Sequence, residues 1–542
     1  MKRKKRDWVI LLLFFFLVFL LRLPSLSQSV LSNDESLYLL MARSFTEGQP
    51  PYTEIWDNKP VGIYLVFSLA LLVFGKSVLS IRIIACFAVA ITSYLLYRLG
   101  SVFSSDNKVG LLAGILYILL SLRNGGLSSN TEVFYATFVV CAFYLLFAIV
   151  INPAQRISQS NFSLFAIGMV MGLGFQIKQV VVFEFIAILV IVGLHLYLQI
   201  LDKRRFVTQL CQDYVLLGVG FFLPFLPILL YFTVTGHFAD YSYANFTANV
   251  SRISDESISF NDFATSFLIQ VRSNLILWVC LLLTPLYWVA SRDTRTEKRN
   301  LTYLLIWVFM AFLGVCSPKS FLTYYFLQLL PSLCLLSSYL IIKTVWSSRE
   351  PSTTRNLLNL ALVLVVPVLS ILYPYLKVGL KSVYFRYVKG LDNWGDDPAI
   401  ISKYLRERVI QQDYIYLADY QPIIYYLVPA KIPTRYALPA FLSQPKLSEV
   451  AGIDAIQELD SIMKKRPLYI IKIKQQESQP DQSKRFYTEL NKYLRKYYVL
   501  DKEFPDGGDT FESIETDINI VQLYKLRNYE NLTSRIAEEN AE

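Results

Sequence analysis

The sequence is poor in charged residues and in the side chains that build metal centres and nucleophile–base pairs. Asp, Glu, Lys and Arg make up 17% of the 542 residues, whereas about a quarter is usual in a soluble globular chain. The two histidines, His195 and His237, are too few and too scattered for a histidine-rich metal centre or a Ser-His-Asp triad. The six cysteines form no CxxC pair, which favours small buried side chains over metal or disulfide roles. No GxxxxGKS/T or GxGxxG loop occurs, so neither type of nucleotide-binding loop is present.

Apolar sequence is what the chain has in excess. Hydrophobic residues make up 54% of it and the mean hydropathy is +0.41. The excess is concentrated in long runs, such as residues 8–21, 109–121 and 356–375. The last of these has the length of about 20 residues that a helix needs to cross the hydrocarbon core of a bilayer. The sequence therefore predicts an α-helical polytopic membrane protein.

The positive charges indicate how the chain crosses the membrane. The net charge is 52 − 42 = +10, and most basic residues stand in short loops between apolar runs, as the positive-inside rule expects. This pattern favours membrane topology over nucleic-acid binding. Loops 98–108, 203–205 and 292–299 are rich in basic residues and are expected in the cytoplasm. The alternate loops hold single cations, among them Arg252, and are expected outside.

The apolar segment 61–75 decides the topology. It is only about 14 residues long, or roughly 21 Å as a helix, against a hydrocarbon core of about 30 Å. If it crossed the membrane, every later loop would change sides against the charge rule. We therefore expect it to lie flat or to re-enter. Taken with an uncleaved first helix, rather than a cleaved signal peptide, the pattern predicts about eleven spans, at residues 8–23, 79–98, 109–122, 132–151, 162–178, 180–200, 213–235, 264–290, 301–316, 321–342 and 356–375.

The remainder of the chain has the composition and the hydrophobic pattern of a small α/β domain. Charges become frequent after residue 377, and apolar runs shorten to strand length at 414–418, 468–473 and 518–524. Residues 447–464 and 483–496 have the periodicity of amphipathic helices, and 505–508 are expected to form a turn. We therefore expect a transmembrane domain at 1–376, with a functional outer loop at 25–78, and an extracytoplasmic α/β domain at 377–542.

Polar side chains gather in the loops assigned to the outer face. The first loop holds the pair Asp34-Glu35 and the segment 57–59 (Asp-Asn-Lys). Lys178 lies where two apolar runs meet, and a lysine there is costly unless it reaches the interface or an anion. Cations gathered at headgroup depth suit a lipid phosphate. The alternatives are that the acids begin a short capped helix and that the cations reach ordinary lipid phosphates.

The first loop resembles that of the membrane glycosyltransferases of family 39 and its relatives. This is the GT-C group, which contains the protein O-mannosyltransferases and the lipid A aminoarabinose transferases. The matching positions are Asp34-Glu35, Tyr38, Ala42-Arg43, Tyr52, Lys59-Pro60, Phe74-Gly75 and Arg82, with weaker matches at Glu132, Lys178, Arg252 and Tyr325. The chain departs from the aminoarabinose transferases at Leu37, Asn58 and Val61. Asn58 replaces an acid that is linked there to bound zinc, so no cofactor is predicted, although a divalent metal stays open.

The resemblance implies an inverting transfer of a sugar from a polyprenyl-phosphate donor to a hydroxyl on the outer face of the plasma membrane. It implies Asp34 and Glu35 as the catalytic carboxylates, with Asp34 as the base. Lys59, Lys178 and Arg252 would bind the donor phosphate, and the supporting residues would be Tyr52, Asp57, Arg82, Glu132 and Tyr325. The implied partners are the lipid-linked donor, membrane lipids and a protein, lipid or glycan acceptor, with no nucleic acid. The alternatives are another polyprenyl-linked glycan enzyme, such as a polymerase or ligase, and a secondary transporter.

Overall fold

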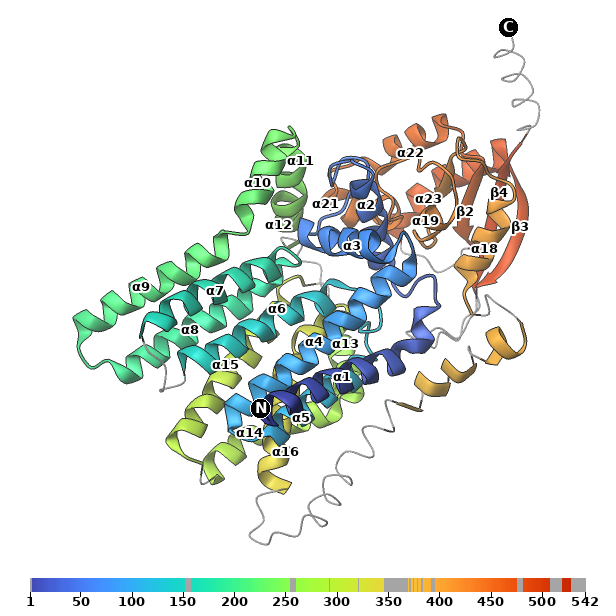
Figure 1. Cartoon of the computed structure of the whole chain (residues 1–542). Helices are drawn as coiled ribbons and strands as arrows, with labels where there is room; N and C mark the ends of the chain where they lie inside the picture. The colour runs from blue at the N-terminus through green and yellow to red at the C-terminus, as the bar shows by residue number, and fades with distance from the viewer. Residues whose placement is uncertain are drawn as a thin grey trace.

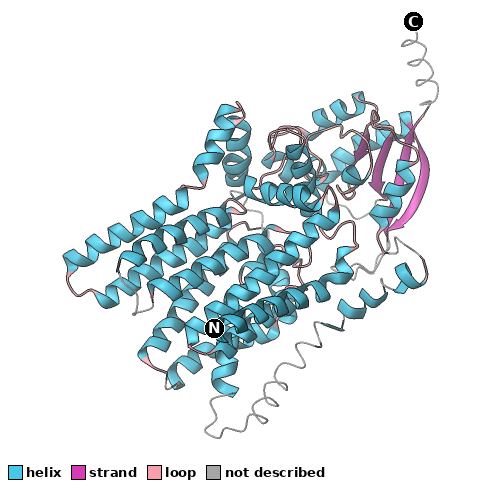
Figure 2. Cartoon of the chain, in the orientation of Figure 1, coloured by secondary structure: helices cyan, strands magenta, loops and turns pink. Residues whose placement is uncertain are grey.

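The chain folds into a helical bundle with a smaller α/β unit at one end (Figures 1 and 2). The computed structural model describes residues 2–151, 157–253, 260–291, 293–319, 321–345, 384–390, 395–474, 481–506 and 519–527, together with 369, 372–373, 375–377 and 379–381. The last predicted span, 356–375, therefore lies almost entirely outside the described residues.

Long apolar helices form the bundle, and most of them overlap the predicted runs. The predicted span 213–235 is instead divided between Lys203–Phe222 and Phe225–Val234. Within the described residues, six helices are long and apolar enough to cross a membrane, or seven if one bent pair is a single span; the number eleven stays a prediction. The helices of the bundle are α1 (Lys2–Leu26), α4 (Val78–Ser104), α5 (Asn107–Leu120), α6 (Thr131–Leu145) with η1 (Leu146–Val150), α7 (Ile157–Phe175), η2 (Gln179–Val181), α8 (Val182–Gln199), α9 (Lys203–Phe222), α10 (Phe225–Val234), α13 (Phe260–Ser273), α14 (Leu275–Ala290), α15 (Arg295–Cys316) and α16 (Leu330–Val345).

The prediction of one helix over 264–290 is wrong. The chain bends by 96° between α13 and α14, at Asn274, whose backbone is not helical. The Asn274 side chain is buried and donates to Gln270 Oε1 at 3.2 Å, and Gln270 in turn donates to the Thr323 carbonyl at 2.8 Å. Gln270 therefore ties the bend to a neighbouring segment, a contact that hydropathy averaged over the run cannot show.

Two short helices lie across one end of the bundle, which we call the capped end (Figure 1). These are α2 (Asn33–Thr46), which begins with the Ser32 side chain accepting from the Glu35 N–H, and the 14-residue α3 (Val61–Phe74). They pack on each other, and α3 also contacts α4. Further short elements stand at this end: α11 (Phe238–Ser242), η3 (Tyr243–Thr247), α12 (Ala248–Ile253) and η4 (Thr323–Gln328).

The α/β unit contains a four-stranded sheet in the order β1-β2-β4-β3. The strands β1 (Ile415–Leu417) and β2 (Tyr469–Ile473) are parallel, and β4 (Asn519–Leu526) is antiparallel to both β2 and β3 (Tyr498–Asp506). Three strands match the predictions. Sequence analysis missed β3, which runs through Pro505 because it is an edge strand, where a missing N–H is tolerated. The helices are α18 (Asp397–Arg406), α19 (Ile424–Leu427), α20 (Ala440–Ser443), α21 (Pro445–Val450), α22 (Ala455–Lys464) and α23 (Asp481–Tyr497), and η5 (Tyr384–Val388) precedes the unit.

One predicted helix of this unit is two helices. Residues 447–464 are divided between α21 and α22, because Gly452 adopts a left-handed backbone (φ +66°) that ends the first helix. Three of the four strands and α23 agree with the sequence analysis to within a few residues.

The α/β unit holds the loop that follows α2. The Trp56 ring lies 4.9 Å from the Phe441 ring, and its backbone N–H donates to the Arg435 carbonyl at 2.8 Å. The Arg43 guanidinium donates to the carbonyls of Tyr425 and Tyr426. The segment before the candidate lysine Lys59 is therefore anchored by residues far along the chain.

Candidate active site

Asp34 lies in the first turn of α2 at the capped end. Its carboxylate accepts a hydrogen bond from the Tyr324 hydroxyl at 2.9 Å (Oδ2), and the side chain is only partly buried. Tyr324 belongs to η4, which precedes α16. The hydrogen bond orients one carboxylate oxygen, so the structure places a positioned carboxylate at this end of the bundle.

Glu35, the next residue, faces a different environment. Its side chain is buried and forms a two-pronged ion pair with Arg82 of α4. It also accepts the backbone N–H groups of Leu31 at 2.6 Å and Ser129 at 2.8 Å. Both carboxylate oxygens are therefore occupied by four donors, which suits a role in fixing α2 against α4 better than proton transfer.

Lys178 stands between α7 and α8 at the same end. It is buried and pairs with Glu132, the second residue of α6. Its Nζ lies 4.1 Å from the centre of the Tyr325 ring and 5.7 Å from that of Tyr324. Since Tyr324 bonds Asp34, the structure brings Lys178, Glu132 and Tyr325 into one neighbourhood with Asp34.

Lys59 is held by the two residues before it. Its Nζ lies 3.7 Å from Asp57 Oδ1 and donates to Asn58 Oδ1 at 3.0 Å. Burial raises the pKa of the Asp57 carboxyl, the Lys59 ammonium opposes that rise, and Asp34 adds to it. Asp57 also accepts the Tyr64 hydroxyl at 2.9 Å. Asp34 therefore lies near enough to Asp57 to act on the charge of its carboxyl.

Tyr52 shapes the loop that carries Lys59. It is fully buried with a left-handed backbone (φ +72°), and its hydroxyl donates to the Lys59 carbonyl at 2.8 Å. Few residues other than glycine adopt this conformation, so packing of the ring and the hydrogen bond hold the turn. Tyr52 thereby fixes the backbone from which Lys59 projects.

Arg252 lies in α12, but its side chain is outside the described residues. Asp255 and Glu256 also lie outside them; this second acid pair, in the same predicted outer loop, is the rival candidate for the base. The helix itself reaches the site, because Asn249 Nδ2 donates to the Asn58 carbonyl at 3.0 Å. Sequence reasoning missed Tyr64, and it named Asn249 and Tyr324 only among the polar side chains of the predicted outer loops, without a specific role.

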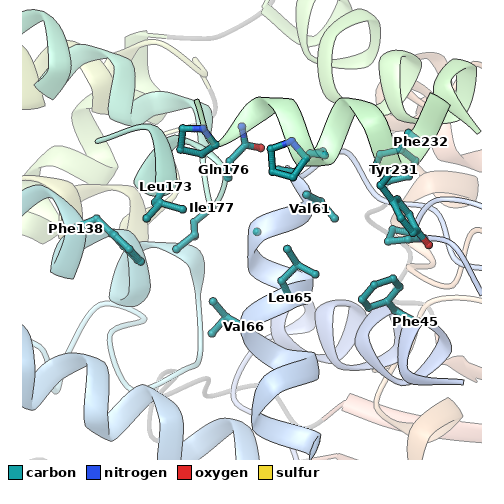
Figure 3. A pocket seen from close by; sticks show the side chains of 15 residues that line it. Phe45, Val61, Leu65, Val66, Phe138, Leu173, Gln176, Ile177, Tyr231 and Phe232 are labelled. Atoms are coloured by element: carbon teal, nitrogen blue, oxygen red, sulfur yellow. The ribbon is translucent and has the colours of Figure 1, made fainter. Parts of the chain in front are cut away.

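An apolar groove of about 450 Å³ is lined by residues of α3, α10 and the end of α7 (Figure 3). Side chains of α3 face Phe138 and Leu173 across it, and α10 closes the third side (Figure 3). Two of its lining residues adjoin the site in sequence: Val61 follows Lys59 by two, and Ile177 directly precedes Lys178. The full lining is Phe45, Pro51, Val61, Gly62, Leu65, Val66, Phe138, Leu173, Gln176, Ile177, Pro224, Pro227, Ile228, Tyr231 and Phe232.

No cluster of three or more His, Cys, Asp or Glu side chains that could hold a metal ion is found in the part of the chain that the structure describes.

The chain is similar to a known protein family and to solved structures. Residues 58–232 match the model of the dolichyl-phosphate-mannose-protein mannosyltransferase family, and no curated protein matches the sequence. The crystal structure of ArnT from Cupriavidus metallidurans, bound to undecaprenyl phosphate, is similar over 95% of this chain and 98% of that one, with a TM-score of 0.59 and 14% identity. The oligosaccharyltransferase AglB from Archaeoglobus fulgidus, in complex with an inhibitory peptide and a dolichol-phosphate, is similar over 86% of this chain and 69% of that one, with a TM-score of 0.48 and 13% identity.

The chain has a GT-C fold of the ArnT type, which confirms the predicted fold class. The fold and the family match together support a membrane glycosyltransferase similar to family 39.

Proposed function

We propose that this chain transfers a sugar from a polyprenyl-phosphate donor to an acceptor hydroxyl, with inversion at the anomeric carbon. The observation that carries the proposal is the position of the groove. An apolar groove is lined by Val61 and Ile177, which stand two residues and one residue along the chain from Lys59 and Lys178, and this combination suits a ligand with a charged head and a long apolar chain. The similar ArnT structure holds undecaprenyl phosphate, a ligand of this kind.

In the proposed reaction Asp34 accepts the proton of the acceptor hydroxyl as its oxygen attacks the anomeric carbon. The bond from that carbon to the phosphate oxygen breaks, and its electron pair leaves with the phosphate. Negative charge on the phosphate therefore grows in the transition state. Lys59 and Lys178, held in a partly dehydrated site, stabilise that growing charge.

The carboxylate partners of the lysines fit this role. Asp57 and Glu132 hold the ammonium groups of Lys59 and Lys178 in place while no phosphate is bound. Glu35 and Arg82 fix the start of α2, and Tyr52 fixes the loop of Lys59. Arg252 is the third proposed phosphate ligand, on the sequence pattern and on the contact of α12 with Asn58.

The proposed orientation puts the capped end outside the plasma membrane. The basic loops around residues 98–108, 203–205 and 292–299 would then face the cytoplasm, as the positive-inside rule requires. The bundle and the α/β unit would form the two domains predicted from sequence, at 1–376 and 377–542.

The test is the transfer of labelled sugar from synthetic undecaprenyl-phosphate sugars to a cell-envelope fraction by the purified chain. Asp34→Asn keeps the size of the side chain and removes the proton acceptor, so turnover should fall by roughly 10²-fold or more. Glu54→Gln, an exposed acid of the same loop, is the matched control and should keep native turnover. If Asp34→Asn transfers sugar at nearly the native rate while Asp255→Asn does not, Asp34 is not the base.

A further inference from the structure

A second cleft, of about 670 Å³, opens on the α/β unit at the place where α22, α23 and β4 end and β3 begins. None of its lining residues belongs to the candidate active site. The lining consists of Asp460, Met463, Lys464, Arg466, Tyr493, Lys496, Tyr497, Tyr498, Leu526 and Arg527.

The cleft carries a strong excess of positive charge. Four cations line it, Lys464, Arg466, Lys496 and Arg527, and within the described residues none of them is in an ion pair with a carboxylate. The single acid, Asp460, accepts a hydrogen bond from the Tyr493 hydroxyl at 2.8 Å. Unpaired cations on the walls of a concave site focus a positive potential and concentrate anions there.

Helix ends explain only part of this charge. Lys464 and Lys496 stand in the last turns of α22 and α23, where cations complement the helix dipole. The helix dipole does not account for Arg466, because this residue lies outside the last turn of α22. It stands two residues after α22 with a left-handed backbone (φ +49°), at the position that glycine usually occupies after a helix. An arginine there bears a conformational cost and directs a guanidinium to the cleft.

Aromatic rings line the cleft beside the cations. The Tyr493 and Tyr497 rings are stacked with centroids 6.3 Å apart, and Lys496 Nζ lies 5.0 Å from the Tyr497 centroid. The Tyr497 side chain is 43% exposed. Exposed aromatic faces offer apolar contact area with a polar edge, which matches the C–H faces of sugar rings. The cations match carboxylate or phosphate substituents.

We propose that this cleft binds an anionic glycan, a chain of sugars that bear carboxylate or phosphate groups. The strands β3 and β4 lie on the side of the α/β unit that faces away from the bundle (Figure 1). A ligand of this cleft therefore approaches from solvent rather than from the headgroup layer around the bundle, which favours a glycan over lipid.

The experiment measures binding of a hexameric oligogalacturonate to the full chain in nanodiscs. A neutral galactose hexamer, a hexaglutamate peptide and phosphatidylglycerol vesicles serve as comparison ligands. The oligogalacturonate should bind at least about tenfold more tightly than each of them, and 0.5 M salt should weaken its binding, because exposed charges are screened. The triple variant Lys464→Gln, Lys496→Gln and Arg527→Gln should lose at least about tenfold in affinity.

The matched control removes three exposed lysines elsewhere on the unit, as Lys403→Gln, Lys474→Gln and Lys492→Gln, and should bind as the native chain does. Tyr497→Leu should weaken binding of the oligogalacturonate without changing that of the peptide. Equal binding of the neutral hexamer, stronger binding of peptide or vesicles, or equal losses in both triple variants would overturn the proposal.

Binding by the Asp34→Asn chain separates the two proposals. If that chain binds the oligogalacturonate normally and transfers no sugar, both stand. If the native chain transfers sugar but binds no oligogalacturonate, only the proposal on the cleft fails.

Discussion

Glu35 and Arg82 form a buried ion pair whose role differs from that of the neighbouring Asp34. Both side chains are about 2% exposed or less. Glu35→Gln would leave the Arg82 guanidinium buried without its counter-charge, and breaking a pair of this kind costs about 3–5 kcal/mol. We therefore expect a lower thermal unfolding midpoint and less monodisperse protein, while the turnover of each folded molecule stays within a few-fold of native.

Glu47→Gln is the matched control, because Glu47 pairs with Lys76 on the surface and such pairs contribute at most about 1 kcal/mol. A Glu35→Gln chain that folds like the native protein but transfers no sugar would instead make Glu35 a catalytic group.

The sequence alone could not assign different roles to Asp34 and Glu35. Asp34 and Glu35 are adjacent on a helix, so their side chains point about 100° apart and meet different partners. The partners of both acids come from distant segments. Glu35 bonds Arg82 and Ser129, and Asp34 bonds Tyr324. Residue type and the family resemblance therefore predict which segments carry the candidate site, while the roles within it depend on tertiary contacts.

The helix α3 approaches the end of α7 through a glycine. The Gly62 N–H donates to the Gln176 carbonyl at 2.7 Å, and a Cβ added at Gly62 would lie 2.4 Å from that oxygen. Because this neighbour is backbone, Gly62→Ala must displace α3, and overpacking of this kind costs about 1–3 kcal/mol. We expect a lower unfolding midpoint and reduced transfer, because the displacement reaches Lys59, three residues away.

The control is Leu69→Ala in the same helix. Leu69 is 55% exposed, so its replacement should change transfer little. If the Gly62→Ala chain transfers sugar at the native rate, the position of α3 against the end of α7 does not affect the activity of the site.

Elements were predicted well where one pattern runs through them and poorly where a single residue interrupts it. The apolar runs located the bundle helices, because hydropathy sums over many residues. The bend at Asn274 and the break at Gly452 each depend on one residue within an otherwise regular pattern. The strand β3 was missed because Pro505 argues for a turn unless the strand is known to be at an edge.

The arrangement of the chain as a unit depends on contacts between its two ends. Ser29 donates to Asp396 from 367 residues away, and Trp56 packs on Phe441. Composition and charge could predict a membrane bundle and an α/β unit, but no local pattern encodes how they dock. These contacts hold the loop that carries Lys59 between the bundle and the α/β unit.

The central claim is that the capped end binds a polyprenyl phosphate, and the most direct measurement is a cryo-electron microscopy structure of the chain with undecaprenyl phosphate. The phosphate should contact the ammonium groups of Lys59 and Lys178, and the prenyl chain should lie in the apolar groove between α3 and α10. The double variant Lys59→Gln and Lys178→Gln should lose the phosphate density. A lipid found at the opposite end of the bundle, or a groove left empty at saturating lipid, would contradict the account.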